Sequence, residues 1–235
     1  MGKCYQITKQ QNCYQDLLPL LASCAGIYTA LQARLLQNVS SSLGDVLVIE
    51  CKYLDMRVAL PLHGPIEAAI QNVKPQVITV GVLAGRSLGA APMQHHLNGF
   101  REIFDTLMQP YLTNQFERHK VAMLQKHHSD RTKLPDAWQM AWVIRNGLSH
   151  NGKVHFDTPK TPSKISAPVH WQGLRIGPEH QGQTILGNLL NIGDLIVLSI
   201  EMEQSLSGKV PWLFMNDQGE TQKLISIGRK SMTSR

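Results

Sequence analysis

A fixed cation and a titratable imidazole lie on either side of a glycine, after an apolar stretch that contains two tryptophans. The cation is Arg145, the imidazole is His150 and the glycine is Gly147. No acidic residue occurs between Asp136 and Asp157. A guanidinium can stabilise the charge of a phosphate, and histidine transfers protons near neutral pH. A positive site without a neighbouring acid favours a phosphate diester over a metal ion or a cationic ligand.

The two side chains can meet only if the helix that carries them loosens between them. In a regular helix, residues five positions apart point about 140° away from each other. Gly147 tolerates a positive φ and is the residue type most often found just past a helix end. We therefore expect the helix to end there and Arg145 and His150 to share one cleft. The amide of Asn146 can hold a neighbouring side chain or a phosphate oxygen.

Residues Arg145 to His150 resemble the R-N-x-x-x-H signature of the HEPN superfamily. The apolar, tryptophan-containing helix before them and the Asn-Gly turn after them are also similar, and the likeness covers about 15 residues. HEPN proteins are small helical bundles, and many are metal-independent endoribonucleases of toxin, defence and RNA-processing systems. The resemblance implies that Arg145 and His150 are catalytic and that two chains form a composite site in a homodimer. It also implies an antitoxin or defence partner, in a defence or plasmid-borne system.

The chemistry expected of such a site needs no metal. A neutral His150 takes the proton of a ribose 2′-hydroxyl, which attacks the adjacent phosphate and leaves a cyclic phosphate. Arg145 stabilises the charge that gathers on the phosphoryl oxygens. Two alternatives remain open. Some HEPN proteins keep the bundle without catalysis, as interaction or nucleotide-binding proteins. The pattern is also compatible with a capped helix end, with Arg145 solvated and His150 an ordinary histidine.

Polar residues around the motif are candidates for binding the substrate: Asn146, Ser149, Asn151 and Lys153. Ser149 and Asn151 can orient the histidine or contact a phosphate, but they can equally satisfy carbonyl groups at the helix end, which is the interpretation we favour. Lys153 and His155 extend the positive surface past the motif. Both are equally compatible with ordinary solvated side chains.

Neither a metal nor a cofactor is expected. The remaining clustered histidines are His95, His96, His119, His127 and His128, and the cysteines are Cys4, Cys13, Cys24 and Cys51. Adjacent residues on a helix point about 100° apart, and no H-E-x-x-H or C-x-x-C pattern accompanies them. Gly81, Gly85 and Gly89 recur every four residues but form neither dinucleotide-binding nor Walker motifs.

Composition indicates a globular protein with a mild excess of positive charge. The 235 residues include 43% hydrophobic residues, and 23 Lys and Arg against 17 Asp and Glu give a net charge of +6. This balance is compatible with RNA as a partner but does not require it. The first residues do not resemble a signal peptide, and the apolar stretches are too short to span a bilayer. We expect a cytoplasmic protein without membrane contact.

The elements that must position the motif are predominantly helical. Apolar residues at three- and four-residue spacings predict helices over 16–39, 93–127, 135–148 and 188–207. A shorter helix is predicted over 65–73, a strand over 77–83, and β-hairpins within 45–62, 169–186 and 210–227. Residues 1–11 are expected to be loose and 228–235 to form a disordered basic tail. These elements predict a mainly α fold: one HEPN-like domain over 1–235, a bundle of four to five long helices with small hairpins.

Overall fold

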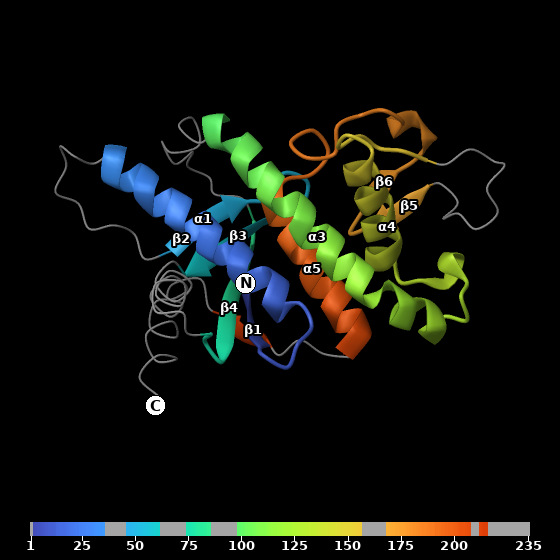
Figure 1. The fold of residues 1–235 in the computed structure, drawn as a ribbon, viewed down its shortest axis with the longest axis horizontal. Coiled ribbons are helices and arrows are strands. Elements are labelled where there is room, and N and C mark those ends of the chain that lie inside the picture. Colours follow the sequence, from blue (N-terminus) through green and yellow to red (C-terminus); the bar gives the residue numbers. More distant parts are fainter. Residues whose placement is uncertain are drawn as a thin grey trace. The chain divides into compact units, whose positions relative to one another are not determined.

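A computed structural model of the chain describes the residues that carry the motif and most of the predicted elements (Figure 1). The described residues are 2–35, 46–61, 74–85, 98–156, 168–207 and 212–215. Four expectations lie outside these residues: the helix over 65–73, the strand over 222–227, the tail over 228–235 and the pair His95 and His96. Among the described residues, no helix combines the length and the apolar character needed to cross a bilayer.

The contacts within the chain divide it into two compact units. The first comprises Met1–Glu50, Asp55–Leu88 and Val210–Arg235, and the second comprises Cys51–Leu54 and Gly89–Lys209. The short connection Cys51–Leu54 therefore groups with the second unit, although it joins two strands of the first. The single domain expected over 1–235 stays a prediction.

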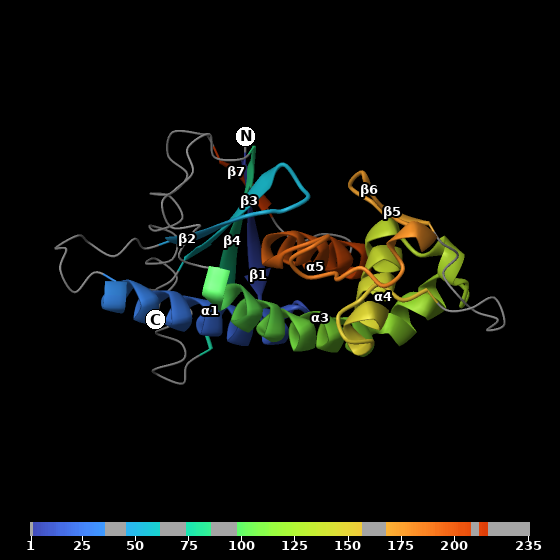
Figure 2. The ribbon, with the colours of Figure 1, turned by 90° about the horizontal axis from the view of Figure 1, so that it is seen from above.

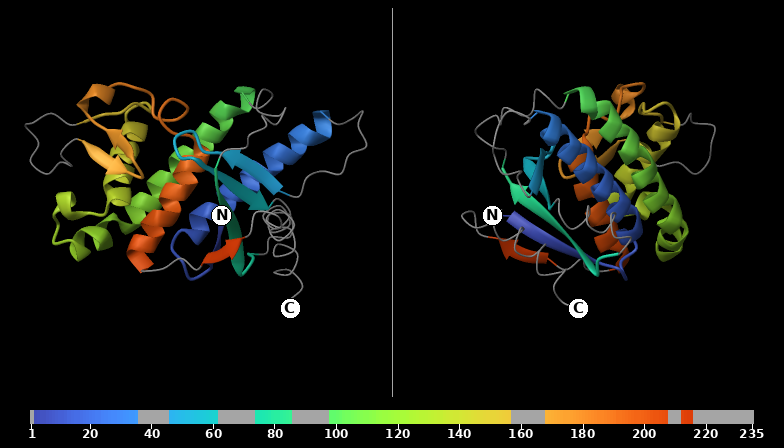
Figure 3. Two further views of the ribbon diagram at one scale, coloured as in Figure 1. Left: turned by 180° about the vertical axis from the view of Figure 1, so that it is seen from behind. Right: turned by 60° about the vertical axis from the view of Figure 1, so that its left-hand side comes forward.

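The first unit contains an antiparallel sheet of five strands in the order β2-β3-β4-β1-β7. The strands are β1 (Gly2–Thr8), β2 (Val46–Glu50), β3 (Met56–Pro61), β4 (Val77–Ala84) and β7 (Trp212–Met215). Helix α1 (Tyr14–Leu35) runs along one face of this sheet (Figures 2 and 3). The hydroxyl of Tyr14 donates a hydrogen bond to the carbonyl of Pro75, which ties the start of α1 to the segment that leads into β4.

This sheet makes the protein a mixed α/β structure, and the predicted mainly α bundle is wrong. The clearest error concerns residues 1–11, which were expected to be loose but contain β1. This strand pairs with β4 on one side and β7 on the other. Tyr5 and Ile7 are buried in the core, and the polar Gln6 lies between them. A segment with such a weak alternation forms a strand because it pairs with segments far away in the sequence. The periodicity of its own residues does not reveal this pairing.

The second unit is built from three long helices and a small hairpin. The helices are α3 (Asn98–Lys126), α4 (Asp136–Ser149) and α5 (Ile192–Ser207), and the hairpin pairs β5 (Val169–Trp171) with β6 (Leu174–Ile176). Short 3-10 helices occur at Arg131–Lys133 and Pro178–His180. The predicted helices over 93–127 and 135–148 are confirmed where the structure describes them, and the helix predicted over 188–207 is confirmed from Ile192 onward.

The hairpin turns earlier than predicted. We expected strands over 169–176 and 183–186 around a turn at 177–182, but the chain reverses at Gln172 and Gly173. Both residues have positive φ, 47° and 83°, as a tight two-residue turn between antiparallel strands requires. Of the predicted second strand, Thr184 and Leu186 form isolated bridges, to Lys153 and Leu190 respectively.

A buried carboxylate closes the start of α5. Asp194 is fully buried and accepts hydrogen bonds from the backbone N–H groups of Lys52, Leu54 and Asn191 at 2.9, 3.0 and 3.0 Å, and a weaker one from Tyr53 at 3.2 Å. The side chain of Asn191 in turn accepts from the Asp194 N–H at 3.2 Å. This reciprocal cap pairs the N–H groups of Asn191 and Asp194 at the helix start, and the other hydrogen bonds to Asp194 hold the connection 51–54.

Candidate functional site at the end of helix α4

Aromatic side chains hold α4 against its neighbours in the second unit. The ring of Phe116, on α3, lies 5.5 Å from that of Trp138 and 5.2 Å from that of Trp142. The indole N–H of Trp138 donates to the carbonyl of Met202, on α5, at 3.2 Å. At the other end of α4, the amide of Gln109 donates to the carbonyl of Leu148 at 3.1 Å. The motif therefore stands on an anchored helix.

Helix α4 does not loosen at Gly147, so this part of the prediction is wrong. The helix continues to Ser149, and His150 is its C-terminal cap. Gly147 is buried, and a Cβ atom there would come within 2.6 Å of the carbonyl oxygen of Lys153 and would also meet the side chain of Ile185. Glycine is needed because these groups pack closely on the helix. The positive φ angles belong instead to Asn151 and Gly152, at 59° and 71°.

Arg145 has an acidic partner that its own sequence neighbourhood does not contain. Its Nη2 atom lies 2.5 Å from Oε1 of Glu117, which is on α3. The expectation of an acid-free site around Arg145 is therefore wrong, because helix packing brings the acid from a distant part of the chain. Lys120 also pairs with Glu117. One carboxylate thus faces two cations, and the cluster keeps one formal positive charge.

The electrostatics of this cluster follow from its geometry. Partial burial by itself would raise the pKa of Glu117. The hydrogen bond from Lys120 and the charge of the neighbouring Arg145 outweigh that effect, so the pKa is below its ordinary value. The carboxylate therefore remains ionised at neutral pH and holds Arg145 against α3.

His150 projects from the end of α4 and is exposed. Its ring contacts that of His155, with centroids 4.3 Å apart and planes inclined by 33°. In the described part of the chain, no hydrogen bond or ion pair joins Arg145 to His150: the first contacts Glu117 and Asn146, and the second contacts His155. The turn at Asn151 and Gly152 reverses the chain and makes the contact between the two histidines possible.

The other predicted site residues have distinct roles. The side-chain oxygen of Asn146 accepts from Nη1 of Arg145 at 3.2 Å, so its amide does hold a neighbouring side chain. The hydroxyl of Ser149 donates to the Arg145 carbonyl at 3.1 Å, which confirms the helix-end interpretation. Asn151 is exposed in the turn. Lys153 is exposed, and its ammonium group forms no ion pair with any acid that the structure describes.

Sequence reasoning missed the environment of His155. The side-chain amide of Gln181 lies between the backbone N–H of Phe156, whose hydrogen bond it accepts at 2.8 Å, and Nδ1 of His155, at 3.4 Å. One signal was available, because an Asn-Gly turn between His150 and His155 brings residues on its two sides together. Nothing near these residues in the sequence pointed to Gln181.

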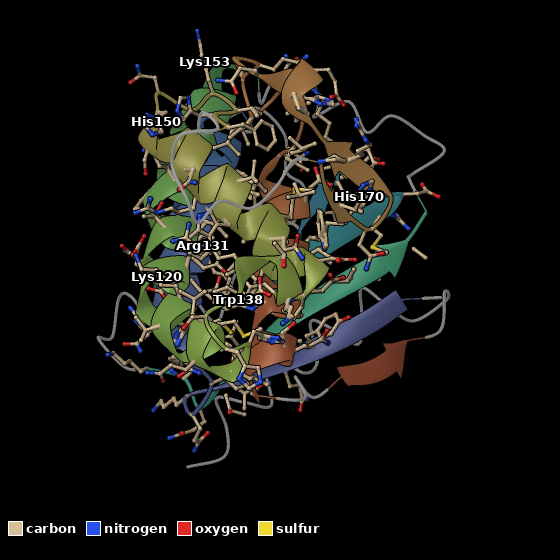
Figure 4. All side chains as sticks on the ribbon, turned by 90° about the vertical axis from the view of Figure 1, so that its right-hand side faces the viewer. Lys120, Arg131, Trp138, His150, Lys153 and His170 are labelled. Carbon is tan, nitrogen blue, oxygen red and sulfur yellow. The ribbon has the colours of Figure 1, made fainter. Side chains whose placement is uncertain are left out.

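Figure 4 shows His150 and Lys153 together at the end of α4, whereas Lys120 lies further back along the helices and His170 stands apart on the hairpin. The guanidinium of Arg131 lies over the Trp142 ring at 4.2 Å, near the middle of α4. No group of three or more potential metal ligands occurs among the described residues. The candidate site thus consists of the imidazoles of His150 and His155 and the ammonium group of Lys153 at the end of α4. The guanidinium of Arg145 lies earlier on the same helix, and its charge is partly neutralised by Glu117.

No family model, no curated protein and no solved structure matches the chain in the comparisons with known proteins.

Proposed function

We propose that the second unit binds RNA at the exposed end of α4 and is a metal-independent endoribonuclease. The observation that carries the proposal is the group His150, Lys153 and His155. These side chains lie on one turn at a helix end, and none of them pairs with an acid that the structure describes. Two imidazoles and an unpaired ammonium suit a phosphate diester, which needs positive charge and a proton acceptor.

In the proposed reaction His150 removes the proton from a ribose 2′-hydroxyl. The 2′-oxygen then bonds to the adjacent phosphorus as the bond to the 5′-oxygen breaks. The 5′-oxygen takes up a proton from solvent water, which gives a 2′,3′-cyclic phosphate and a 5′-hydroxyl. Lys153 and Asn151 bind the phosphate backbone from the turn. Arg145 adds positive charge from the preceding part of α4. It forms a cluster with Glu117 and Lys120, in which two cations face one carboxylate, so the cluster keeps a net positive charge.

The resemblance of Arg145–His150 to the HEPN signature supports the same proposal and extends it. The second unit alone carries this resemblance, within three long helices. The proposal includes a homodimer, an action in the cytoplasm, and a place in a toxin–antitoxin or defence system. Cys13, Cys24 and Cys51 form no disulfide in the described part of the chain, which is compatible with a reducing compartment.

Cleavage of single-stranded RNA in the presence of EDTA tests the nuclease proposal. We expect the unmodified protein to cleave, the His150→Ala variant to lose about 10²-fold or more of the rate, and the His170→Ala variant to cleave normally. His170 is an exposed histidine of the same unit that stands apart from the site. Equal cleavage by all three proteins, or by none, would count against catalysis.

One observation favours a second candidate, a non-catalytic interaction or nucleotide-binding protein. The ion pair between Arg145 and Glu117 gives the arginine a structural task, which is to join α4 to α3. In that case exchange of Arg145 for methionine lowers stability and leaves RNA binding unchanged. A fall in RNA affinity at unchanged stability would instead favour a role of Arg145 in RNA binding over a purely structural role.

A further inference from the structure

We propose that His155 is a phosphate-binding residue that acts as a neutral hydrogen-bond donor through Nε2, with its tautomer set by Gln181. This inference rests on the proposed RNA site and adds a residue to it. It assigns His155 and His150 different tasks: His150 exchanges protons, whereas His155 keeps its proton and directs it at a non-bridging phosphoryl oxygen.

The orientation of the Gln181 side-chain amide shows which ring nitrogen of His155 accepts a hydrogen bond. A backbone N–H can only donate, so the N–H of Phe156 must face the oxygen of this amide, at 2.8 Å. The nitrogen of the same amide then faces Nδ1 of His155, at 3.4 Å. An amide nitrogen is a donor and never an acceptor. Nδ1 of His155 must therefore accept, which makes it the unprotonated nitrogen of the ring.

The tautomer follows directly. A neutral imidazole whose Nδ1 accepts a hydrogen bond carries its proton on Nε2. An N–H on Nδ1 would place two donors against each other, which the contact between Nδ1 and the Gln181 amide nitrogen does not match. In the described part of the chain, Nε2 of His155 has no hydrogen-bond partner of its own. The ring thus presents a donor that is free to bind a ligand.

The contact between His155 and His150 explains why the two rings would have different roles. The two ring centroids are 4.3 Å apart, and two imidazolium rings at this separation would repel each other. A neutral His155 leaves His150 able to take up the proton of the 2′-hydroxyl without a second positive ring beside it. The Nε2–H of His155 meanwhile strengthens its hydrogen bond as charge develops on the phosphoryl oxygen. No bond to His155 forms or breaks.

The tautomer can be measured without any activity. Long-range ¹H–¹⁵N correlation spectra of the full-length protein, labelled on histidine, separate protonated from unprotonated ring nitrogens. At neutral pH we expect His155 to show a protonated Nε2 and an unprotonated Nδ1. In the Gln181→Glu variant a carboxylate faces Nδ1, so the proton should move there. Protonation of Nδ1 in the unmodified protein would overturn the proposal.

Two amide substitutions test the binding role, with 2′-O-methyl RNA as a probe that cannot be cleaved. The amide nitrogen of glutamine can replace Nε2 of histidine, whereas the shorter asparagine replaces Nδ1. We expect the His155→Gln variant to bind the probe nearly as well as the unmodified protein, and His155→Asn and His155→Ala to bind it about tenfold more weakly. Equal loss in all three variants would overturn the donor role.

Cleavage of unmodified RNA separates this inference from the nuclease proposal. A neutral donor predicts that His155→Gln keeps most of the rate, while His150→Gln is inactive because glutamine cannot accept the proton. If His155→Gln is as inactive as His150→Gln, His155 is itself a proton-transfer group and the inference fails while the nuclease proposal stands. If the probe binds as predicted but no protein cleaves RNA, the nuclease proposal fails and the inference stands. If no RNA binds, both fail.

Discussion

Two helix ends of the second unit contrast sharply. At the start of α5, the buried carboxylate of Asp194 accepts four backbone N–H groups. At the end of α4, His150 is exposed, and neither of its ring nitrogens bonds to a residue that the structure describes. At the start of α5, the polar group holds two segments of the chain together. At the end of α4, polar groups without such partners stand on a firmly packed helix, which is the arrangement that a binding site requires.

Removal of Asp194 should have the largest effect on this contrast. In the Asp194→Ala variant the four N–H groups lose their shared acceptor in a dry environment. We expect the free energy of unfolding to fall by about 3 kcal/mol or more, measured by urea denaturation. Exchange of His150 for alanine is the matched control, and its stability should stay within about 0.5 kcal/mol of the unmodified protein. Equal losses of stability in the two variants would contradict the distinction between the buried start of α5 and the exposed end of α4.

A methyl group at Gly147 should have an intermediate effect. The added Cβ atom meets the Lys153 carbonyl and the Ile185 side chain, so Gly147→Ala should destabilise the protein by about 1–3 kcal/mol and displace the turn that carries Lys153 and His155.

The control for this substitution is Gly26→Ala in α1, where a Cβ atom has open space. That change should stabilise a helix interior by up to about 1 kcal/mol. A neutral or stabilising Gly147→Ala substitution would contradict the close packing described above.

The smallest effect is expected at Glu117. The Glu117→Gln variant loses the ion pairs with Arg145 and Lys120, which are partly exposed and contribute below about 1 kcal/mol. The pKa of Glu117 is lowered in the folded protein. Its contribution is therefore present above the ordinary pKa of a glutamate and is lost as the pH falls through the lowered value.

Denaturation at a series of pH values measures this contribution. The unmodified protein should exceed the variant in stability at pH 7, and the difference should vanish in acid. A constant difference down to low pH would mean that the ion pairs do not cause it.

The sequence predicted what depends on local periodicity. The motif helix, with Trp138 and Trp142 on its packed side, and the helix over 188–207 were found because apolar residues recur on one face. The strand β1 was missed because its polar residues are held by pairing with β4 and β7. Backbone pairing of this kind leaves little trace in the strand's own residues.

The candidate site was predicted in composition but not in contacts. Arg145 and His150 both lie near the end of α4. Glu117 pairs with the arginine from α3, and the ring of His155 contacts that of His150 from beyond the turn. Gly147 was expected to end the helix because glycine permits positive φ, but here it makes room for a neighbouring backbone. A glycine in a sequence does not reveal which of these two reasons applies.

The chemistry of the cleaved ends tests the central claim most directly. Single-stranded RNA is incubated with the purified protein in EDTA, and the termini of the products are determined by mass spectrometry. The account predicts 2′,3′-cyclic phosphate and 5′-hydroxyl ends, with loss of cleavage in His150→Ala. Products that carry a 5′-phosphate and a 3′-hydroxyl, or cleavage that requires a divalent metal, would contradict it.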